Sequence, residues 1–521
     1  MSGARDQGEV SLFEQEGELG REQRRTLSCH VIDVPPGVAV LKIFFDYQPR
    51  RVTDEARATT LIAAGVDAQL DEARAAGVQI PSGAREALLE QPALVQTRAA
   101  LRNLLNLALV DPSGSHRGRW DQNLPGDGPS REDVLTPRWA SPGYVAGAIP
   151  AGAWQVTLEA HEVLEPCRYQ IRVAALRADV PPAQDGDLRG EVVPPATRQY
   201  ATPLPVGWVR GELHCHSTAS DGLYSPRQLV ARAREIGLDF IALTDHNSTS
   251  GLEQLADADF PVIGGCEVTT FRGHFLALGL SPAREAPAWY AGEQPHGAAR
   301  LVEQVRQQGG LFGPAHPFVL GNPVCCGCRL ELAVPVPSID LLEVWSRGGA
   351  EPVGMLHALQ LFDELRRAGR RVTAVAGRDW HGPQQEQGMD YPATVVQAGR
   401  DPASILEAVR RGACYLSVGP VVDLRLRLHA RRAGIGDDLR LPPGSRLGTC
   451  VEARVGPLPR AGRLRLLRGG RPLLDRAVGQ GGTALELPDV SPARGGVRLE
   501  LWDSAGRPMV LTNPVEFFQE G

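Results

Sequence analysis

Between residues 208 and 415, strand-like and helix-like segments alternate, and this alternation restricts the possible folds more than any other feature. Apolar runs such as DFIALTDHN (239–247) and RVTAVAGRDWHG (371–382) are typical of buried strands. Longer segments such as SPRQLVARAREIG (225–237) and DPASILEAVRRG (401–412) have the spacing of amphipathic helices. Repeated strand–loop–helix units predict an α/β fold built around a parallel sheet or barrel.

The regions on either side of this α/β part have strand signals of a different kind. Residues 29–200 are predicted to form a β-sandwich with an Ala/Leu/Glu/Arg-rich helical insertion at about 55–108. Residues 416–521 alternate apolar and polar residues between glycine turns, which predicts a small C-terminal immunoglobulin-like β-sandwich. The charged residues 1–28 are expected to form a flexible arm.

Composition narrows the class of protein. The chain has 521 residues, of which 42% are hydrophobic and 22% charged, as expected for a globular protein of several domains. No basic block accompanies the net charge of −6, so a nucleic-acid partner is not expected. No apolar run reaches the roughly 18 residues of a membrane helix, and the N-terminus lacks a signal-peptide core, so a cytoplasmic location is expected. The oligomeric state is left open.

The cysteines are few and scattered. There are nine, an odd number, which favours reduced thiols over a disulfide framework. Cys325, Cys326 and Cys328 form a CCGC cluster, but no second pair stands at the spacing of a zinc site. The cluster is therefore predicted to be a loop with free thiols.

Residues of metal-ligand type recur where apolar runs of the α/β part end or begin. Strand ends converge at one mouth of a βα barrel, so groups far apart in sequence would meet there. Residues two apart on a strand face the same side, which pairs His214 with His216 and Asp379 with His381. The candidate ligands are His214, His216, Asp221, His246, Glu267, His274, His316, Asp379 and His381.

This set of side chains indicates a catalytic metal centre. Imidazole and carboxylate ligands without thiolate suit Zn, Mn or Fe. Nine candidates exceed the needs of one ion, so two or three divalent ions are predicted, with Glu267 or Asp379 bridging. Such a pair of ions supports hydrolysis by a bridging hydroxide, with Asp379, His246 and Glu267 as the candidate catalytic residues.

Two arginines each have two possible roles. Arg272 and Arg378 could bind an anionic substrate, although Arg378 could equally pair with a carboxylate and Arg272 could be solvated surface. The remaining histidines are expected to be structural: His30, His116, His161, His296, His357 and His429.

At these motifs the chain resembles the polymerase-and-histidinol-phosphatase (PHP) family. LHCHSTASDG, ALTDHN, GCEVTT…GHFLALG, PAHP and GRDWH occur in the order of the family's motifs over about 208–415. The resemblance implies a distorted (β/α)7 barrel with two or three Zn, Mn or Fe ions at one mouth, and hydrolysis that is usually of phosphoesters.

A further resemblance is to the long CehA/McbA-type members of that family, which include carbamate ester hydrolases. It rests on LRNLLNLALVDPSGSHRGRW, SPGYVAGAIPAGAWQV and GWVRGELHCHS. The family pattern implies three ligand sets. The first is His214, His216, Glu267 and Asp379; the second is Asp221, His246 and His381; the third is Glu267, His274 and His316.

The leading hypothesis is a metal-dependent phosphoesterase acting on a small anionic phosphomonoester or phosphodiester. One alternative is hydrolysis of carbamate or carboxyl esters at the same site. Another is a non-catalytic binding protein in which the barrel is only a scaffold.

Overall fold

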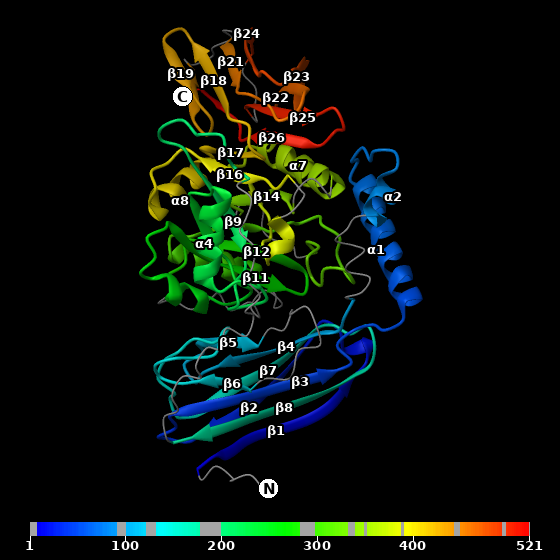
Figure 1. Ribbon diagram of the computed structural model, residues 1–521, viewed down its shortest axis with the longest axis vertical. Helices are drawn as coiled ribbons and strands as arrows, with labels where there is room; N and C mark the ends of the chain where they lie inside the picture. Colours follow the sequence, from blue (N-terminus) through cyan, green and yellow to red (C-terminus); the bar gives the residue numbers. More distant parts are fainter. Residues whose placement is uncertain are drawn as a thin grey trace.

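In the computed structural model the chain forms three parts that follow one another along the long axis of the molecule (Figure 1). An N-terminal pair of sheets lies at one end, an α/β part in the middle and a C-terminal group of sheets at the other end. The structure describes residues 8–90, 101–120, 132–177, 199–281, 297–331, 339–347, 352–386, 390–441, 449–491 and 496–519.

Two four-stranded antiparallel sheets form the N-terminal sandwich, and their buried side chains share one core that includes Phe45, Trp154 and Ile171. The first sheet has the order β1 (Val10–Leu19), β8 (Cys167–Leu176), β3 (Val40–Gln48) and β6 (Glu132–Leu135). The second has the order β2 (Thr26–Val34), β7 (Gly152–Glu162), β4 (Leu104–Val110) and β5 (His116–Trp120).

The expected flexible arm over residues 1–28 is wrong for its described part. Strand β1 pairs antiparallel with β8 from Val10↔Ala175 to Leu19↔Cys167, and β2 begins at Thr26. A short 3-10 helix (Arg21–Gln23) joins the two strands. The charged residues of β1 are compatible with a strand because they alternate with partly buried residues that face the core.

The helical insertion is shorter than expected. Helices α1 (Glu55–Ala75) and α2 (Ala84–Leu89) are present, but Leu104–Val110, expected to be helical, forms strand β4 at the centre of a sheet. A short continuous apolar run such as LLNLALV does not distinguish a buried strand from a buried helix. Helix α1 packs beside the α/β part, where the Gln69 side chain donates to the Phe318 carbonyl at 2.8 Å.

The α/β part has parallel strands at its centre and antiparallel strands beside them. β9 (Val209–Cys215), β10 (Phe240–Leu243) and β11 (Val262–Thr270) are parallel; β12 (Gly273–Leu278), β13 (Leu311–Pro314), β16 (Ala393–Val396) and β17 (Cys414–Ser417) extend that sheet antiparallel. β14 (Leu341–Ser346) and β15 (Thr373–Gly377) form a separate parallel pair. The helices are α4 (Pro226–Ile236), α6 (Gly297–Gln307), α7 (Pro352–Arg367) and α8 (Pro402–Arg411), with 3-10 segments Ser250–Leu255 and Pro383–Glu386.

The expected distorted (β/α)7 barrel is not confirmed in the described part of the chain. Among the described residues no closed ladder is found, and the fold is a mixed, sheet-rich α/β arrangement. The reason is visible between β11 and β12, where only Phe271 and Arg272 join the strands. So short a connection permits an antiparallel hairpin but not a parallel crossover.

Strands of the C-terminal sandwich continue the sheet of the α/β part. The order runs from β16 and β17 to β26 (Pro508–Thr512), β25 (Val497–Asp503), β22 (Gly462–Arg468) and β23 (Arg471–Val478). A second sheet contains β19 (Arg431–Ala433), β18 (Val422–Leu428), β21 (Thr449–Val455) and β24 (Thr483–Val490), and β20 (Asp438–Leu441) pairs with β27 (Glu516–Gln519). Within the described ranges, no helix is both long and apolar enough to cross a membrane.

Candidate metal centre

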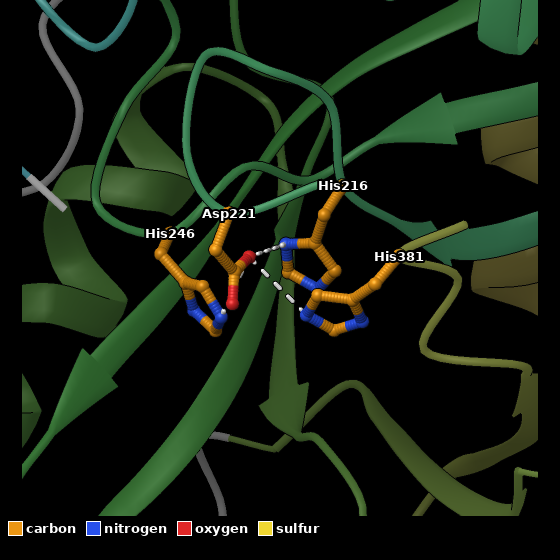
Figure 2. A group of neighbouring side chains, drawn as sticks. All are labelled: His216, Asp221, His246 and His381. Carbon is orange, nitrogen blue, oxygen red and sulfur yellow. Dashed lines mark ion pairs between the residues drawn. The ribbon is translucent and has the colours of Figure 1, made fainter. Parts of the chain in front are cut away.

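The nine candidate ligands lie together at one end of the α/β strands. They lie within β9, β11 and β12 or in the loops that follow β9, β10, β13 and β15. Seven are buried, while the side chains of His246 and His381 are 11% and 27% exposed. Figure 2 shows four of them, His216, Asp221, His246 and His381, with their side chains turned toward one another.

Four donor atoms form a first group with the dimensions of a tetrahedral site. His214 Nε2 lies 3.3 Å from both Glu267 Oε2 and Asp379 Oδ1. His216 Nε2 lies 3.4 Å and 3.1 Å from the same two oxygens. Ligands about 2.0–2.1 Å from a tetrahedral ion are separated by about 3.3 Å, so this group matches such an ion.

A second group surrounds Asp221 (Figure 2). Its Oδ1 lies 3.2 Å from His381 Nε2, 3.6 Å from His246 Nε2 and 3.9 Å from His216 Nδ1. His381 is the most exposed ligand, so this group is the one nearest to solvent. The imidazole of His216 contributes one nitrogen to each of the first two groups.

A third group gathers around the other oxygen of Glu267. Its Oε1 lies 3.0 Å from His274 Nδ1 and 2.9 Å from His316 Nε2. Cys328, which was not among the candidate ligands, lies beside His274 and His316, with its Sγ 4.0 Å from His274 Nδ1. Glu267 thus faces the first group with one oxygen and the third with the other.

Buried ring nitrogens in this centre lack ordinary hydrogen-bond partners. His214 Nε2, His216 Nδ1 and His316 Nδ1 are enclosed and have no hydrogen-bond partner. An unsatisfied buried polar atom costs about 1–3 kcal/mol. Coordination would satisfy His214 Nε2 and His216 Nδ1, which face the first two groups, so the residues present fit bound divalent ions.

Two of the imidazoles and the shared carboxylate have the protonation states that suit metal binding, whereas burial is outweighed by neighbouring carboxylates that raise the pKa of His214 and His381. Burial lowers the pKa of His216 to about 3 and that of His274 to about 4, so both rings are neutral at pH 7. Burial raises the pKa of Glu267, but His214, His246 and His274 outweigh it and hold the pKa well below the usual range. Neutral imidazoles and ionised carboxylates are the forms that coordinate metal ions.

Residues that sequence reasoning missed orient the ligands. Glu343 of β14 accepts from His214 Nδ1 at 2.8 Å, which turns Nε2 of that ring toward the first group. Asp245 accepts hydrogen bonds from the Ser217 and Ser220 side chains and so holds the loop that carries Asp221. The only sequence signal for Glu343 is a single acid inside the apolar run LLEVWS.

Two predicted substrate-binding arginines have different positions. Of the two roles considered for Arg378, the structure favours pairing with a carboxylate: its side chain is fully buried, and Nε donates to Glu212 Oε2 at 3.1 Å, because the end of β9 bridges to the residues after β15. Arg272 is exposed at the β11–β12 turn, so its role stays a prediction. Arg347, which sequence reasoning missed, donates from Nε to Asp379 Oδ2 at 2.8 Å.

Backbone strain is concentrated at this centre. Asn247, His316, Arg347 and Asp379 have positive φ angles of 47°, 27°, 55° and 52°. Non-glycine residues rarely adopt this conformation, and it persists where surrounding structure enforces it, often at functional sites. Gly222 lets the loop backbone pack directly against the backbone of His216, since a Cβ at this position would lie 2.2 Å from the His216 carbonyl oxygen.

The expectation of free thiols in the CCGC cluster is wrong for two of its three cysteines. Cys325 and Cys328 form a disulfide, while Cys326 is free and partly exposed. Sequence spacing does not reveal this pairing, because it depends on how the loop is folded.

The remaining histidines of the described part lie outside the three groups. His357 stacks on Phe318 at 3.7 Å between ring centroids, and His161 packs edge-on against Phe271 at 4.8 Å. His296 lies outside the described residues.

Comparison with known proteins adds a family to this geometry. Residues 212–334 match the model of the PHP domain. A 3',5'-nucleoside bisphosphate phosphatase of Chromobacterium violaceum is 38% identical over 106 residues, which cover 19% of this chain and 36% of that protein. An error-prone DNA polymerase of Cutibacterium acnes is 35% identical over 119 residues, covering 20% of this chain and 10% of the polymerase.

Among solved structures, a two-domain protein of Bacteroides vulgatus containing a predicted PHP-like metal-dependent phosphoesterase aligns over 61% of this chain and 98% of its own length. The identity is 16% and the TM-score 0.36. The chain spans about a third or less of the two curated relatives named above.

Proposed function

We propose that this chain, which carries a PHP domain, is a metal-dependent phosphoesterase that hydrolyses a small anionic phosphate ester. The observation that carries the proposal is the sharing of one carboxylate between clusters of donors. Glu267 directs Oε2 to His214 and His216, and Oε1 to His274 and His316. A shared carboxylate is suited to holding two ions close together, the arrangement used in phosphoryl hydrolysis.

Divalent ions bound there would lower the pKa of coordinated water and offset the charge of a phosphate group. The chain itself supplies orientation and charge around them. Arg347 bonds Asp379 and is one-third exposed, so it brings a positive charge to the edge of the centre where an anionic ester would enter.

Three residues keep the catalytic roles proposed from sequence. Glu267 joins the ligand groups, and Asp379 accepts from Arg347 while its other oxygen faces His214 and His216. Asp379 has a pKa well below the usual range, because Arg347 and His214 outweigh the effect of burial, so it is a poor proton donor. We assign His246 a role in stabilising the leaving oxygen through the second ligand group: its Nδ1 is held by Thr269 Oγ1 at 2.6 Å, so that its Nε2 would hold an ion that offsets the developing charge.

The test is an activity panel on the full chain supplied with Zn, Mn or Fe. The substrates are an aryl phosphomonoester, an aryl phosphodiester, a nucleoside 3',5'-bisphosphate, a single-stranded oligonucleotide and an aryl carboxyl ester. We expect turnover of the small phosphate esters and a loss of at least about a hundred-fold in Glu267→Gln, together with loss of bound metal. Glu407→Gln, a matched change on the exposed face of α8, should leave both unchanged.

Several results would overturn the proposal. Turnover of the carboxyl ester alone would replace it with carboxyl or carbamate ester hydrolysis. Hydrolysis of the oligonucleotide without the small esters would replace the substrate class. Full activity in metal-depleted protein or in Glu267→Gln would remove the metal centre from the chemistry.

A further inference from the structure

The segment 321–330, here called the cysteine loop, lies directly against the third ligand group. Gly327 has a φ of +78°, and a Cβ there would lie 2.4 Å from the Thr270 carbonyl oxygen and 3.5 Å from His274 Nε2. A side chain at this position would therefore push the loop away from His274. The loop is held in place where the Gly327 N–H donates to Asn322 Oδ1 at 2.9 Å.

The sulfur of Cys328 is positioned as a ligand. Cys328 is fully buried, its Sγ lies 4.0 Å from His274 Nδ1, and one donor atom each of Cys328, His274 and His316 lie within 4.8 Å of one another. In a tetrahedral site with about 2.0–2.1 Å to nitrogen and 2.3 Å to sulfur, the two donors are about 3.6 Å apart. These three side chains form one group of possible metal ligands.

In the disulfide, this same Cys328 sulfur is bonded to Cys325. Cys325 and Cys328 are separated by three positions, so the bond closes a very short loop and removes little chain entropy from the unfolded state. Its contribution to stability is small by that argument. Its position beside His274 therefore points to control of the ligand group.

The two cysteines differ in accessibility. Cys325 is partly exposed, whereas Cys328 is enclosed. The Arg347 guanidinium contacts Cys325 Sγ at 3.5 Å and also bonds Asp379. Because Cys325 is the more exposed of the two sulfurs, it is the one that a dithiol can reach, and its contact with Arg347 links it to the first ligand group.

We propose that reduction of the Cys325–Cys328 bond turns Cys328 into a ligand, with His274 and His316, of a thiol-controlled metal site. This inference deepens the proposed function, because it concerns one of the ions of the same centre. The reductant is a dithiol, which supplies two electrons.

The exchange balances in two steps. One thiolate of the dithiol attacks Cys325 Sγ, forms a mixed disulfide and releases Cys328 as a thiolate. The second thiol of the dithiol, once deprotonated, then attacks the dithiol sulfur that is bonded to Cys325. This step releases Cys325 and leaves the dithiol oxidised. The two protons of the dithiol pass to Cys325 and to solvent when Cys328 coordinates an ion.

The test uses Co²⁺ as the probe and thiolate-to-cobalt absorption as the readout, measured on the full chain with and without a dithiol reductant. We expect the absorption band, and at least about ten-fold tighter binding of one Co²⁺, only after reduction. Cys325→Ser should show the band without reductant, and Cys328→Ser should lack it in both states. Cys326→Ser, the matched control in the same loop, should behave as the natural chain.

Two outcomes would overturn the inference. One is the absence of the band from both the reduced chain and Cys325→Ser, and the other is its loss in Cys326→Ser. Either result leaves the proposed phosphoesterase intact if turnover still depends on Glu267 and metal. Full turnover in Glu267→Gln together with a cobalt band in Cys325→Ser would overturn the proposed phosphoesterase and leave the thiol-controlled metal site standing.

Discussion

The two sandwiches are attached to the α/β part in different ways. On the C-terminal side β26 pairs with β17, so backbone hydrogen bonds continue from one part into the other. The Asn513 side chain adds to this seam by bonding the backbone of Ala374 and Cys414. On the N-terminal side, no strand of the described sandwich pairs with a strand of the α/β part.

Contacts of the N-terminal sandwich go instead to loops that carry the candidate ligands. His161 packs on Phe271, in the turn between Glu267 and His274. Glu162 accepts from Asn322 of the cysteine loop. We therefore expect the N-terminal sandwich to affect how well the ligand-bearing loops are ordered. We expect the C-terminal sandwich to affect the stability of the sheet that supports them.

The largest effect is expected at the C-terminal seam. Asn513→Ala leaves the buried backbone groups of Ala374 and Cys414 without their partner, so the free energy of unfolding should fall by about 3–5 kcal/mol. Turnover per folded molecule should stay the same. Thermal unfolding and kcat measure the two effects, with Arg507→Ala in the exposed β25–β26 turn as the control. A loss of kcat without loss of stability would contradict the division of roles.

The second largest effect is expected at low pH, where the N-terminal sandwich should lose stability. Burial lowers the pKa of His116 to about 4 from an ordinary 6.5, so the folded ring stays neutral where the unfolded ring is already charged. The contribution of the neutral His116 ring to the free energy of unfolding is complete above pH 6.5. It is lost as the pH falls toward 4, and the total loss is about 3 kcal/mol. Calorimetry between pH 7 and 4 should show a smaller loss in His116→Asn than in the natural chain. An equal loss would exclude His116 as the cause, and His429→Gln in the other sandwich serves as the control.

A smaller effect is expected where the N-terminal sandwich meets the site. Asn322→Ala removes the acceptor of the Gly327 N–H and the bond to Glu162, so the cysteine loop loosens beside His274. We expect kcat/KM to fall about ten-fold, because small misplacements near reacting groups are costly, with little change in thermal stability. Asn322→Asp keeps the acceptor for the Gly327 N–H but repels Glu162. Comparison of the two variants therefore shows which of these two contacts affects the kinetics. Unchanged kinetics in both variants would mean that this seam does not order the site.

The smallest effect is expected at the surface of the same seam. Arg25 and Glu331 form an ion pair at 2.7 Å, but the side chains are 29% and 37% exposed. Arg25→Ala should lower the free energy of unfolding by no more than about 1 kcal/mol, and less at high salt. A double-mutant cycle with Glu331→Ala measures the pair itself, and a coupling of several kcal/mol would show that this seam also carries stability.

Much of the candidate centre was predictable because its signals are local. Strand-end positions and spacing of two bring His214, His216, Asp379 and His381 to one side, and the structure does gather the nine candidates. The resemblance to the PHP family, drawn from the same motifs, is confirmed by the match over residues 212–334. The subgroup, the metals and the substrate stay predictions.

Other parts of the site were not predictable because they depend on contacts between distant segments. Glu343 and Arg347 become important only because β14 lies beside β15, which brings them to His214 and Asp379. Cys328 meets His274 only because a glycine lets its loop approach.

The sequence by itself determined which side chains of metal-ligand type follow the apolar runs and roughly where each strand ends, because periodicity and turn residues act over a few positions. Only the tertiary structure decided strand directions, the burial of Arg378 against Glu212 and the disulfide beside the third group. Those features follow from packing between segments far apart along the chain, and no local pattern encodes them.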